Sequence, residues 1–527
     1  MKAKYITIVK GLSLSIVLSI LSSCMGDLDR VPFIEVTSAT VFKDPANYKP
    51  LLAKLYAGLA VSGQQGPAGK PDISGIDEGF STYLRQYFKA QELPTDEAVI
   101  GWNDGSLPSY HTMTWTSGNE FITAMYNRIY YQIGICNEYI RETSDEKLAS
   151  RGITSPEIKM YRAEARFLRA LSYYHALDMF GSVPFVTEKD AVGSFLPKQI
   201  SKADLFTYIE SELKAIEVDM AEPRKNEYAR ADKAAAWTLL TKLYLNAEVY
   251  INAGKYTEAI TSAKKVIGAG YVIESKYQNL FLADNNKSAE IIFPIAFDGT
   301  KTKTWGGMTF MVHAPVGGKM NPAEFGINGG WGGLRTTQQF VDHFDDKSGK
   351  TDSRAMFFTD GQNKDVADIS AFTDGYAITK YKNVTSTGVK GSDSEGNFPD
   401  TDFPMFRLAD VYLMYAEAVL RGGSGGDLTT ALQYVNALRA RAYNGAQGNV
   451  TLLNLDLIIK ERGRELYWEC HRRTDVIRFK QFTGTSYVWA WKGGTKAGAG
   501  VSDNMKLFPI PSSDIVANPN LVQNAGY

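Results

Sequence analysis

The stretch KMYRAEARFLRALSYYHALDMFG, residues 159–181, decides the fold. Its apolar residues recur at three- and four-residue steps, which predicts an amphipathic helix. Gly181 ends this helix, and Pro184 prevents it from continuing. The next segment, SKADLFTYIESELKAIEVDM, begins with Ser201, which we expect to cap a second helix, with Asp204 at its third position. The pattern favours a mainly helical protein.

Helix pairs recur further along the chain. Residues 230–270 predict two helices with a turn at 252–254, and their length and pattern are typical of a tetratricopeptide repeat. FPMFRLADVYLMYAEAVL, from Phe403, and LTTALQYVNALRARAY predict another pair, and IIKERGRELYWECHRRTDVIRF continues the series from Ile458. Since such pairs cannot bury their apolar faces alone, we expect them to stack.

The remaining sequence has a different texture. Residues 60–118 and 271–402 are rich in Gly, Thr, Asn and Asp and lack a helical period, apart from short strand-like runs. We therefore expect a helical frame at about 120–270 and 403–482 that carries long loops and small β elements in one domain. Loops held on a rigid scaffold are where function usually lies.

Composition excludes some partners. The chain has 527 residues, with 57 basic and 58 acidic ones and a net charge of −1. No basic excess points to nucleic acid. Aromatic residues make up 12%, which fits a surface that recognises a flat ligand.

The N-terminus predicts where in the cell the protein is located. A lysine-bearing head is followed by the apolar run GLSLSIVLSIL and then by LSSC, which ends at Cys24. This pattern resembles a bacterial lipobox and predicts a signal peptide over 1–23, with lipid attached to Cys24. An ordinary secretory signal with an incidental cysteine is the alternative. No later stretch is long and apolar enough to span a membrane, so we expect the mature chain, 24–527, to be tethered through lipid alone.

Two cysteines remain after Cys24. Cys136 and Cys470 lie in helix-like stretches among aromatic residues. They could pair in an oxidising compartment, but we favour two separate buried thiols. No Cys/His cluster has the spacing of a zinc site.

Catalytic motifs are weak. GGSGG, residues 422–426, matches the serine nucleophile pattern formally, but a predicted helix precedes it, so we expect Ser424 in a turn between helices. Asp77–Glu78 and Asp96–Glu97 offer paired carboxylates. Adjacent residues rarely face each other as a glycosidase acid and base must. The sequence therefore predicts a protein that is not an enzyme.

Two tryptophans stand in glycine-rich loops. TWGG spans Thr304–Gly307 and NGGWGG spans Asn328–Gly333. Glycine is the most permissive residue for the backbone. We expect these glycines to lift Trp305 and Trp331 into solvent as parts of a stacking surface; the alternative is that both rings anchor their loops.

Four stretches together carry a family resemblance. They are AEARFLRALSYYHALDMFGSVP, FPMFRLADVYLMYAEAVLR, ERGRELYWECHRRTDVIRF and LFPIPSSDIVANPNLVQNAGY. With the lipobox, they resemble the SusD/RagB family of outer-membrane glycan-binding lipoproteins. The resemblance implies a non-catalytic protein on the outer face of the outer membrane. It also implies a tetratricopeptide-like scaffold that delivers oligosaccharides to a SusC-like TonB-dependent transporter.

The resemblance extends to the starch site of the family's founding member. KPDISGIDEGFSTYLRQYF and ELPTDEAVIGW, within residues 70–102, are similar to that region. The glycan would be starch or maltooligosaccharide, with rings stacking on tryptophan and hydroxyls bonded at their edges. Another glycan, or a scaffold acting mainly through protein contacts, is the alternative. The residues implied are Asp77, Arg85, Trp102, Asn103 (with Asp104 as its alternative), Trp305 and Trp331.

A calcium site is implied in the same way. FPDTDFP places Asp400 and Asp402 two residues apart in a loop, and calcium prefers six to eight oxygen ligands. The resemblance puts a third ligand at Asn286, for which Asp284 could substitute. A solvated acidic turn is the alternative.

Overall fold

The computed structural model describes residues 38–193 and 195–527. The chain divides into two compact parts, Met1–Asn47 and Tyr48–Tyr527. Within its described residues, the first part contains helix α2 (Ser38–Val41) and the 3-10 turn η1 (Pro45–Asn47). The predicted signal peptide and Cys24 lie outside the described residues.

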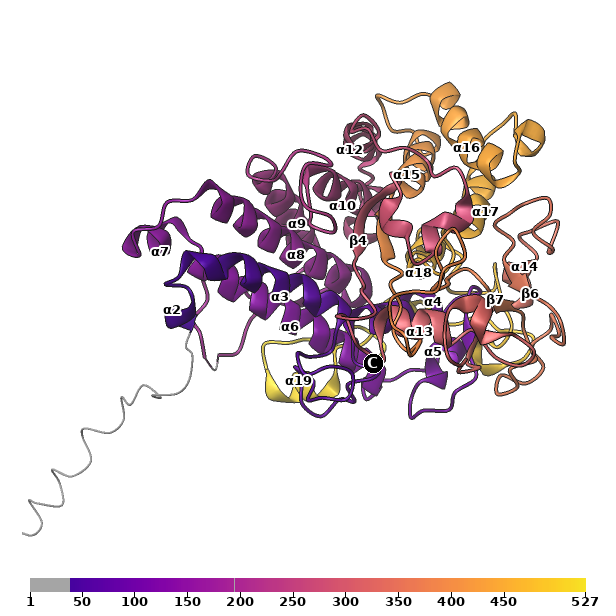
Figure 1. Cartoon of the computed structure of the whole chain (residues 1–527), viewed down its shortest axis with the longest axis horizontal. Coiled ribbons are helices and arrows are strands. Elements are labelled where there is room, and N and C mark those ends of the chain that lie inside the picture. Colours follow the sequence, from indigo (N-terminus) through magenta and orange to yellow (C-terminus); the bar gives the residue numbers. More distant parts are fainter. Residues whose placement is uncertain (1–37, 194) are drawn as a thin grey trace, which may run out of the picture. The chain divides into compact units, whose positions relative to one another are not determined.

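The second part is mainly helical, as predicted, and its strands are short (Figure 1). The helices are α3 (Tyr48–Ala60), α4 (Tyr83–Glu92), α5 (Pro108–Thr112), α6 (Glu120–Glu142), α7 (Asp145–Ser150), α8 (Pro156–Phe180), α9 (Lys202–Ile216), α10 (Lys233–Leu245), α11 (Ala247–Ile251), α12 (Tyr256–Ile267), α13 (Gly307–His313), α14 (Gln338–Val341), α15 (Leu408–Leu420), α16 (Leu428–Ala442), α17 (Leu455–Leu466), α18 (Arg472–Arg478) and α19 (Ser512–Ala517). The strands are β1 (Val99–Ile100), β2 (Val183–Pro184), β3 (Gln199–Ile200), β4 (Ile291–Ile295), β5 (Leu334–Arg335), β6 (Phe357–Phe358), β7 (Ala377–Ile378) and β8 (Phe403–Arg407). They pair antiparallel as β1–β5, β2–β3, β4–β8 and β6–β7.

The two helices predicted first are confirmed. Helix α8 ends at Phe180, and Gly181 takes a φ of 74° while its N–H donates to the carbonyl of Leu177. That left-handed backbone is one that glycine adopts readily. The side chain of Ser201 caps α9 by accepting a hydrogen bond from the N–H of Asp204 at 3.1 Å.

The helix predicted from Phe403 is partly wrong. Residues 403–407 form β8, and the helix begins only at Leu408. All of β8 and β4 is buried, so neither strand shows the alternation that marks a half-exposed strand. Pro404 in β8 is also unsuited to a helix interior. GGSGG joins α15 to α16 as predicted, and the N–H of Ser424 donates to the hydroxyl of Thr257.

Neighbouring helices stack along the chain (Figure 1). Helix α6 packs on α8, α8 on α9, α10 on α12, α12 on α15, and α15 on both α16 and α17. Helices α4 and α13 lie inside the ranges expected to be loops, and they pack on each other. The tetratricopeptide geometry of this stack stays a prediction.

Buried ion pairs join the loop region to the helices. Arg407 of β8 donates to Glu290 at 2.8 Å and to Glu465 of α17 at 2.7 Å. Arg354 contacts Glu461 of α17 at 2.6 Å and Glu465 at 3.2 Å. All five side chains are almost fully buried, so each charge depends on its partners.

Helix α18 makes similar contacts with the segment before β1. The guanidinium of Arg472 donates to both oxygens of Asp96, at 2.7 and 2.8 Å. Next in sequence, Glu97 accepts the backbone N–H of Trp468 at 3.1 Å. Glu92 accepts the N–H of Cys470 at 2.6 Å, and burial raises the pKa of Glu92 to about 7. The position of β1 is therefore fixed from the C-terminal third of the chain.

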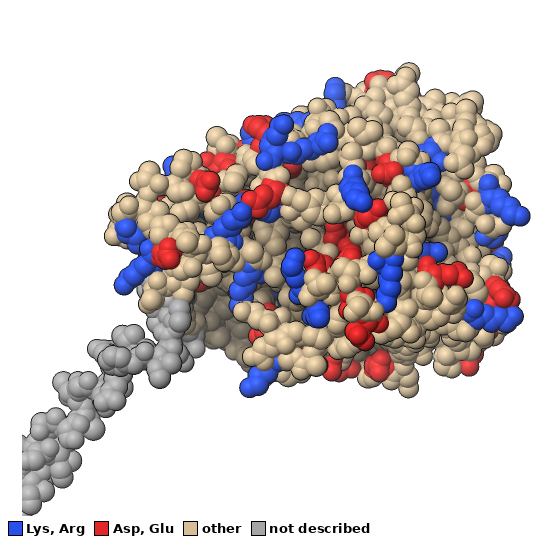
Figure 2. All heavy atoms as spheres, in the orientation of Figure 1, with Lys and Arg blue, Asp and Glu red and all other residues tan. Residues whose placement is uncertain are grey.

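Cys136 and Cys470 are two separate buried thiols, and burial raises the pKa of Cys136 to about 12. Among the described residues, no helix has both the length and the apolar character that a membrane span requires. Lysine, arginine and acidic residues are intermixed on the face shown in Figure 2.

We predict that Glu465→Ala lowers the free energy of unfolding by about 3–5 kcal/mol, because it removes a carboxylate that three buried arginines, Arg354, Arg407 and Arg441, share as an acceptor. Urea denaturation measures the loss. Lys319→Ala is the control, since Lys319 pairs with Asp360 at 2.9 Å and both side chains are more than 60% exposed. The control should change stability by less than about 1 kcal/mol. Equal losses for the two variants would contradict this role of the buried pairs.

Candidate functional site

A two-stranded ribbon brings Trp102 and Trp331 together. β1 pairs with β5, and the N–H of Gly101 donates to the carbonyl of Gly333 at 3.0 Å. Trp102 follows β1 and Trp331 precedes β5, so both tryptophans emerge at the same end of the ribbon. Their ring centroids are 6.3 Å apart with planes inclined by 47°, and the indole N–H of Trp102 faces the carbonyl of Trp331 at 3.4 Å. Both rings are partly exposed.

The loop that carries Trp331 is held by the C-terminal end of α13. The last carbonyls of a helix lack partners within it. Here the carbonyl of His313 accepts the N–H of Trp331 at 2.9 Å, and the carbonyl of Ala314 accepts that of Gly333 at 2.8 Å. Beyond the helix, the carbonyl of Val316 accepts the N–H of Gly332 at 2.9 Å. The glycine-rich loop thus completes the hydrogen bonding of this helix end.

Two glycines of this loop, Gly330 and Gly333, allow close approach to neighbouring atoms, and the ring of Trp331 is still partly exposed. A Cβ at Gly333 would lie 2.4 Å from Cε2 of Trp102, and one at Gly330 would lie 2.1 Å from the carbonyl oxygen of Val316. Real Cβ atoms do not make such contacts. The loop is therefore packed against its neighbours.

The N-terminal ends of α4 and α13 meet at Thr82. Its hydroxyl accepts the N–H of Gly307 at 3.0 Å and caps α4 through the N–H of Arg85 at 3.4 Å. A Cβ at Gly306 would lie 2.2 Å from that hydroxyl, so TWGG also serves close approach. Trp305 is partly exposed, and its ring lies 5.0 Å from the ring of Phe398, between centroids.

Arg85 connects the two groups of rings. Its Nη1 donates to the carbonyl of Gly79 at 3.0 Å and to that of Trp305 at 3.2 Å. Its guanidinium carbon lies 4.5 Å from the ring centroid of Phe310 and 5.8 Å from that of Trp102. Burial lowers the pKa of Arg85 to about 10, so the side chain stays charged at neutral pH. Among the described residues, no acceptor is bonded to its Nη2.

The other two expected residues lie at the rim of this group. Asp77 is exposed, and one of its carboxylate oxygens accepts the N–H groups of Gly79 at 2.8 Å and Phe80 at 3.3 Å. Asp77 and Arg85 are thereby tied to the same residue, Gly79. Asn103 follows Trp102 and is exposed, as is Asp104, whose charge opposes the lowering of the pKa of Arg85.

Sequence reasoning missed the side chains that support the rings. Phe310 is fully buried beneath Arg85 and Trp102. His313 stacks on Trp331, with centroids 4.9 Å apart and planes 24° apart, and Phe398 backs Trp305. The apolar run GMTFMVH is a signal from which a buried segment could have been predicted. Nothing in it indicated which rings it would support.

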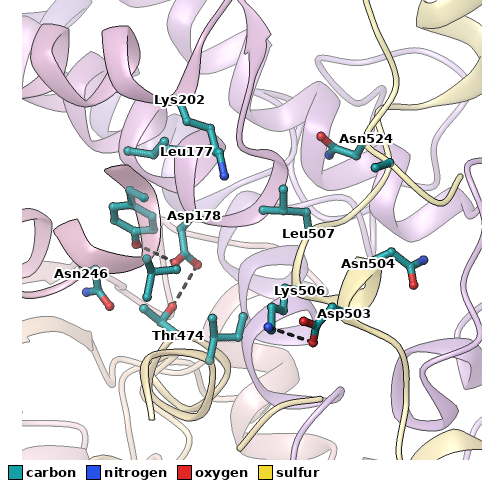
Figure 3. A pocket seen from close by; sticks show the side chains of 14 residues that line it. Leu177, Asp178, Lys202, Asn246, Thr474, Asp503, Asn504, Lys506, Leu507 and Asn524 are labelled. Atoms are coloured by element: carbon teal, nitrogen blue, oxygen red, sulfur yellow. Dashed lines mark hydrogen bonds and ion pairs between the residues drawn. The ribbon is translucent and has the colours of Figure 1, made fainter. Parts of the chain in front are cut away.

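A separate cavity of about 400 Å³ lies between α8, α11, α18 and the C-terminal tail (Figure 3). None of the expected site residues lines it. The carboxylate of Asp178 in its wall accepts hydrogen bonds from Tyr250 at 2.7 Å and Thr474 at 2.9 Å. Arg473 contacts the same carboxylate at 3.1 Å, so Asp178 serves to join these helices.

The three carboxylates implied for calcium, Asp284, Asp400 and Asp402, are each engaged by donors of the protein itself. One oxygen of Asp402 accepts the N–H of Phe297 at 2.7 Å and the other accepts the hydroxyl of Tyr228. Asp400 accepts the N–H groups of Gly299 and Ser392 at 2.7 and 2.6 Å. The carboxylate of Asp284 accepts both donors of Ser386, and Asn286 is exposed. Over the described ranges, no group of three or more His, Cys, Asp or Glu side chains is placed to hold a metal ion.

We predict that Gly333→Ala displaces the indole of Trp102 and destabilises the protein by about 1–3 kcal/mol, as overpacking does. Circular dichroism should show a weaker coupling signal between the two indoles. Gly329→Ala is the matched control, because a Cβ there meets nothing within 4 Å. An unchanged spectrum for Gly333→Ala would contradict the packing described.

The buried carboxyl of Asp402 predicts a pH dependence of stability. Burial raises its pKa to about 6, above the value of about 3.9 for an unfolded chain. The folded state therefore binds the proton more tightly, and stability falls as pH rises from about 4 through about 6. Asp402→Asn should remove a loss on the order of 2 kcal/mol, measured by denaturation at pH 4.5 and 7.5. A variant with the wild-type pH profile would show that Asp402 is not the group responsible.

Calcium binding at Asp400 and Asp402 stays a prediction, and the same samples test it. A bound cation would stabilise the ionised form of Asp402 and raise the melting temperature. This gain should disappear with chelator and in Asp400→Asn. A melting temperature unaffected by calcium and by chelator would show that calcium does not bind at Asp400 and Asp402.

Two family models match the chain. The model described as the SusD family matches residues 358–527, and the one described as "Starch-binding associating with outer membrane" matches residues 35–245. The starch-binding protein SusD of Bacteroides thetaiotaomicron is 37% identical, and the match covers all of both chains. SusD-like protein P2 of Formosa agariphila is 26% identical, over 82% of this chain and 86% of its own.

Solved structures share the fold. The surface glycan-binding protein A of Bacteroides fluxus superposes with a TM-score of 0.70 at 19% identity, covering 92% of this chain and all of its own. A SusD superfamily protein of Parabacteroides distasonis gives 0.70 at 21% identity, covering 94% of this chain and all of its own. With full-length identity of 37% to one relative and this shared architecture, the chain belongs to the SusD family.

Proposed function

We propose that the chain binds starch and maltooligosaccharides, which are α-1,4-glucans, without cleaving them. The observation that carries the proposal is the pair Trp102 and Trp331, whose partly exposed rings are inclined by 47° beside the guanidinium of Arg85. Two inclined platforms suit a glucan chain that curves. The 37% identical relative is named as a starch-binding protein, which supports the same ligand.

The chemistry of the site fits sugar recognition. Glucose rings present C–H groups on their faces, which pack on indoles, and hydroxyls at their edges, which need donors and acceptors. Nη2 of Arg85 and the exposed carboxylate of Asp77 supply these at the rim. Stacking of one ring contributes roughly 1–3 kcal/mol, as it does for nucleic-acid bases, so a site of a few rings binds in the micromolar to millimolar range.

Catalysis by Asp96 and Glu97 is excluded by their contacts. Both are buried, with Asp96 engaged by Arg472 and Glu97 by the backbone of Trp468. Neither carboxyl is accessible to act as a general acid or base on a bound sugar. The protein acts by binding.

We place the protein at the outer membrane, facing the exterior. The description "associating with outer membrane" of the second family model supports this location. In this proposal, a lipid on Cys24 is the only tether and a SusC-like transporter receives the glycan. Weak binding suits such a role because the cargo must be released.

Affinity electrophoresis tests the proposal. We expect amylopectin to retard the wild-type protein, and Trp102→Ala or Trp331→Ala to weaken binding about tenfold or more, the effect of losing one stacked ring. Trp237→Ala is the matched control, because this partly exposed tryptophan of α10 lies outside the site. It should bind like the wild type.

The other gels discriminate between the alternatives. Retardation by xylan or levan in place of amylopectin would change the glycan and keep the family role. No retardation by any of the three would favour a scaffold that works through protein contacts. Reducing sugar released from amylopectin by the purified protein would overturn a role limited to binding.

A further inference from the structure

One buried histidine touches both halves of the proposed glycan site. His313 ends α13 and is 1% exposed. Its ring stacks on Trp331, with centroids 4.9 Å apart and planes inclined by 24°. One face of the indole thus packs on imidazole, and the ring is still partly exposed.

Both ring nitrogens of His313 face backbone carbonyls. Nδ1 lies 2.7 Å from the carbonyl oxygen of Gly329, and Nε2 lies 2.9 Å from that of Asn397. A carbonyl oxygen can only accept, and a neutral imidazole carries a single N–H. Neutral His313 therefore satisfies one of the two contacts, and only the imidazolium donates to both.

The two carbonyls belong to the supports of different rings. Gly329 lies two residues before Trp331. Asn397 directly precedes Phe398, which backs Trp305 at 5.0 Å. The same two segments are also joined by the N–H of Asn328, which donates to the carbonyl of Gly396 at 3.1 Å. His313 therefore fastens the Trp331 loop to the segment that supports Trp305.

We propose that His313 is a positioning residue whose second hydrogen bond, made only when the ring is protonated, tightens glycan binding at acid pH. The inference rests on the proposed function, because it concerns the regulation of that site. His313 does not touch the sugar. It acts through the loops that hold Trp331 and Trp305.

The charge of His313 can change with pH, because no neighbouring ion pair in the described part of the chain fixes its protonation state. Burial lowers the pKa of His313, while the two carbonyls oppose that change. An imidazolium stacked on an indole gains a cation–π contact as well. Among the described residues, none forms an ion pair with His313. The charged residues on the elements packed around it are Arg85, Lys89 and Glu92 of α4, Lys319 and Glu324 before Gly329, and Lys390, Asp393 and Glu395 before Asn397.

The direction of the effect follows from the sign of that shift. A lowered pKa places the change in charge on the acid side of the usual value of about 6.5. At a pH above this pKa, one of the two contacts of His313 with a carbonyl lacks a hydrogen bond. As the pH falls below the pKa, both hydrogen bonds form, and they hold the loop of Trp331 to the segment that supports Trp305.

Calorimetric titration with maltoheptaose from pH 7.5 to pH 5 tests the inference. We expect the dissociation constant of the wild type to fall about threefold or more on acidification, the effect of one added hydrogen bond. His313→Gln replaces the imidazole by an amide, which does not take up a proton in this pH range, so it should bind with a flat pH profile. A flat wild-type profile, or a His313→Gln variant with the wild-type profile, would overturn the inference.

His111 supplies the matched control. It is equally buried, and its nitrogens also face two carbonyls, those of Leu93 at 3.1 Å and Ala490 at 2.9 Å. His111→Gln should keep the wild-type pH profile of binding. A flat profile for this variant would show that the effect belongs to buried histidines in general, which also overturns the inference.

A measurement without sugar separates this inference from the proposed function. Protonated imidazole quenches a stacked indole, so tryptophan emission should fall on acidification in the wild type and not in His313→Phe. If maltoheptaose fails to bind at every pH while this quenching appears, the proposed function is wrong, but the protonation of His313 beside Trp331 is confirmed. If the sugar binds and the quenching is absent, the role of His313 is wrong and the proposed function is retained.

Discussion

The structure depends on the pairing of charges that folding has buried. Glu465 of α17 accepts hydrogen bonds from Arg407, Arg354 and Arg441, and Glu461 accepts one from Arg354. These arginines come from β8, from the loop region and from α16. Because an unpaired buried charge costs several kcal/mol, each segment has one position at which its charge is satisfied. Nonpolar packing alone would not define the register of so many short segments.

The same constraint extends to the proposed glycan site. Arg472 holds Asp96, and Asp96 lies three residues before β1, which ends directly ahead of Gly101 and Trp102. From the other side, α13 supports Arg85 and Trp102 through Phe310 and holds Trp331 through its last carbonyls. A helix of seven residues thus sets the spacing of Trp102 and Trp331, which lie far apart in the sequence. Irregular backbone becomes a rigid surface because it completes the hydrogen bonding of regular elements.

Features encoded in local sequence could be predicted, and features that depend on distant partners could not. Ser201 and Gly181 act at the helix ends where spacing placed them, since capping involves residues a few positions apart. The start of α15 was misplaced because burial on both faces of β8 hides the strand period. The aromatic residues of the proposed site were predicted from resemblance to a family, and their role in binding stays a prediction. Their supports, Phe310 and His313, escaped because nothing local in sequence shows which ring will lie above them.

The contact between Gly333 and Trp102 limits how this protein can change over evolution. With the indole in place, no side chain fits at position 333, so this position is closed to substitution for as long as the ring is kept. Substitution of the supporting residues Phe310 and His313 is limited in the same way, because each of them contacts more than one neighbour. In the proposed site, the positions free to vary without undoing the fold are therefore those of the exposed rim, such as Asn103 and Asp104. Adaptation to a different glycan would therefore appear as substitutions at these rim positions, while the buried residues stay the same.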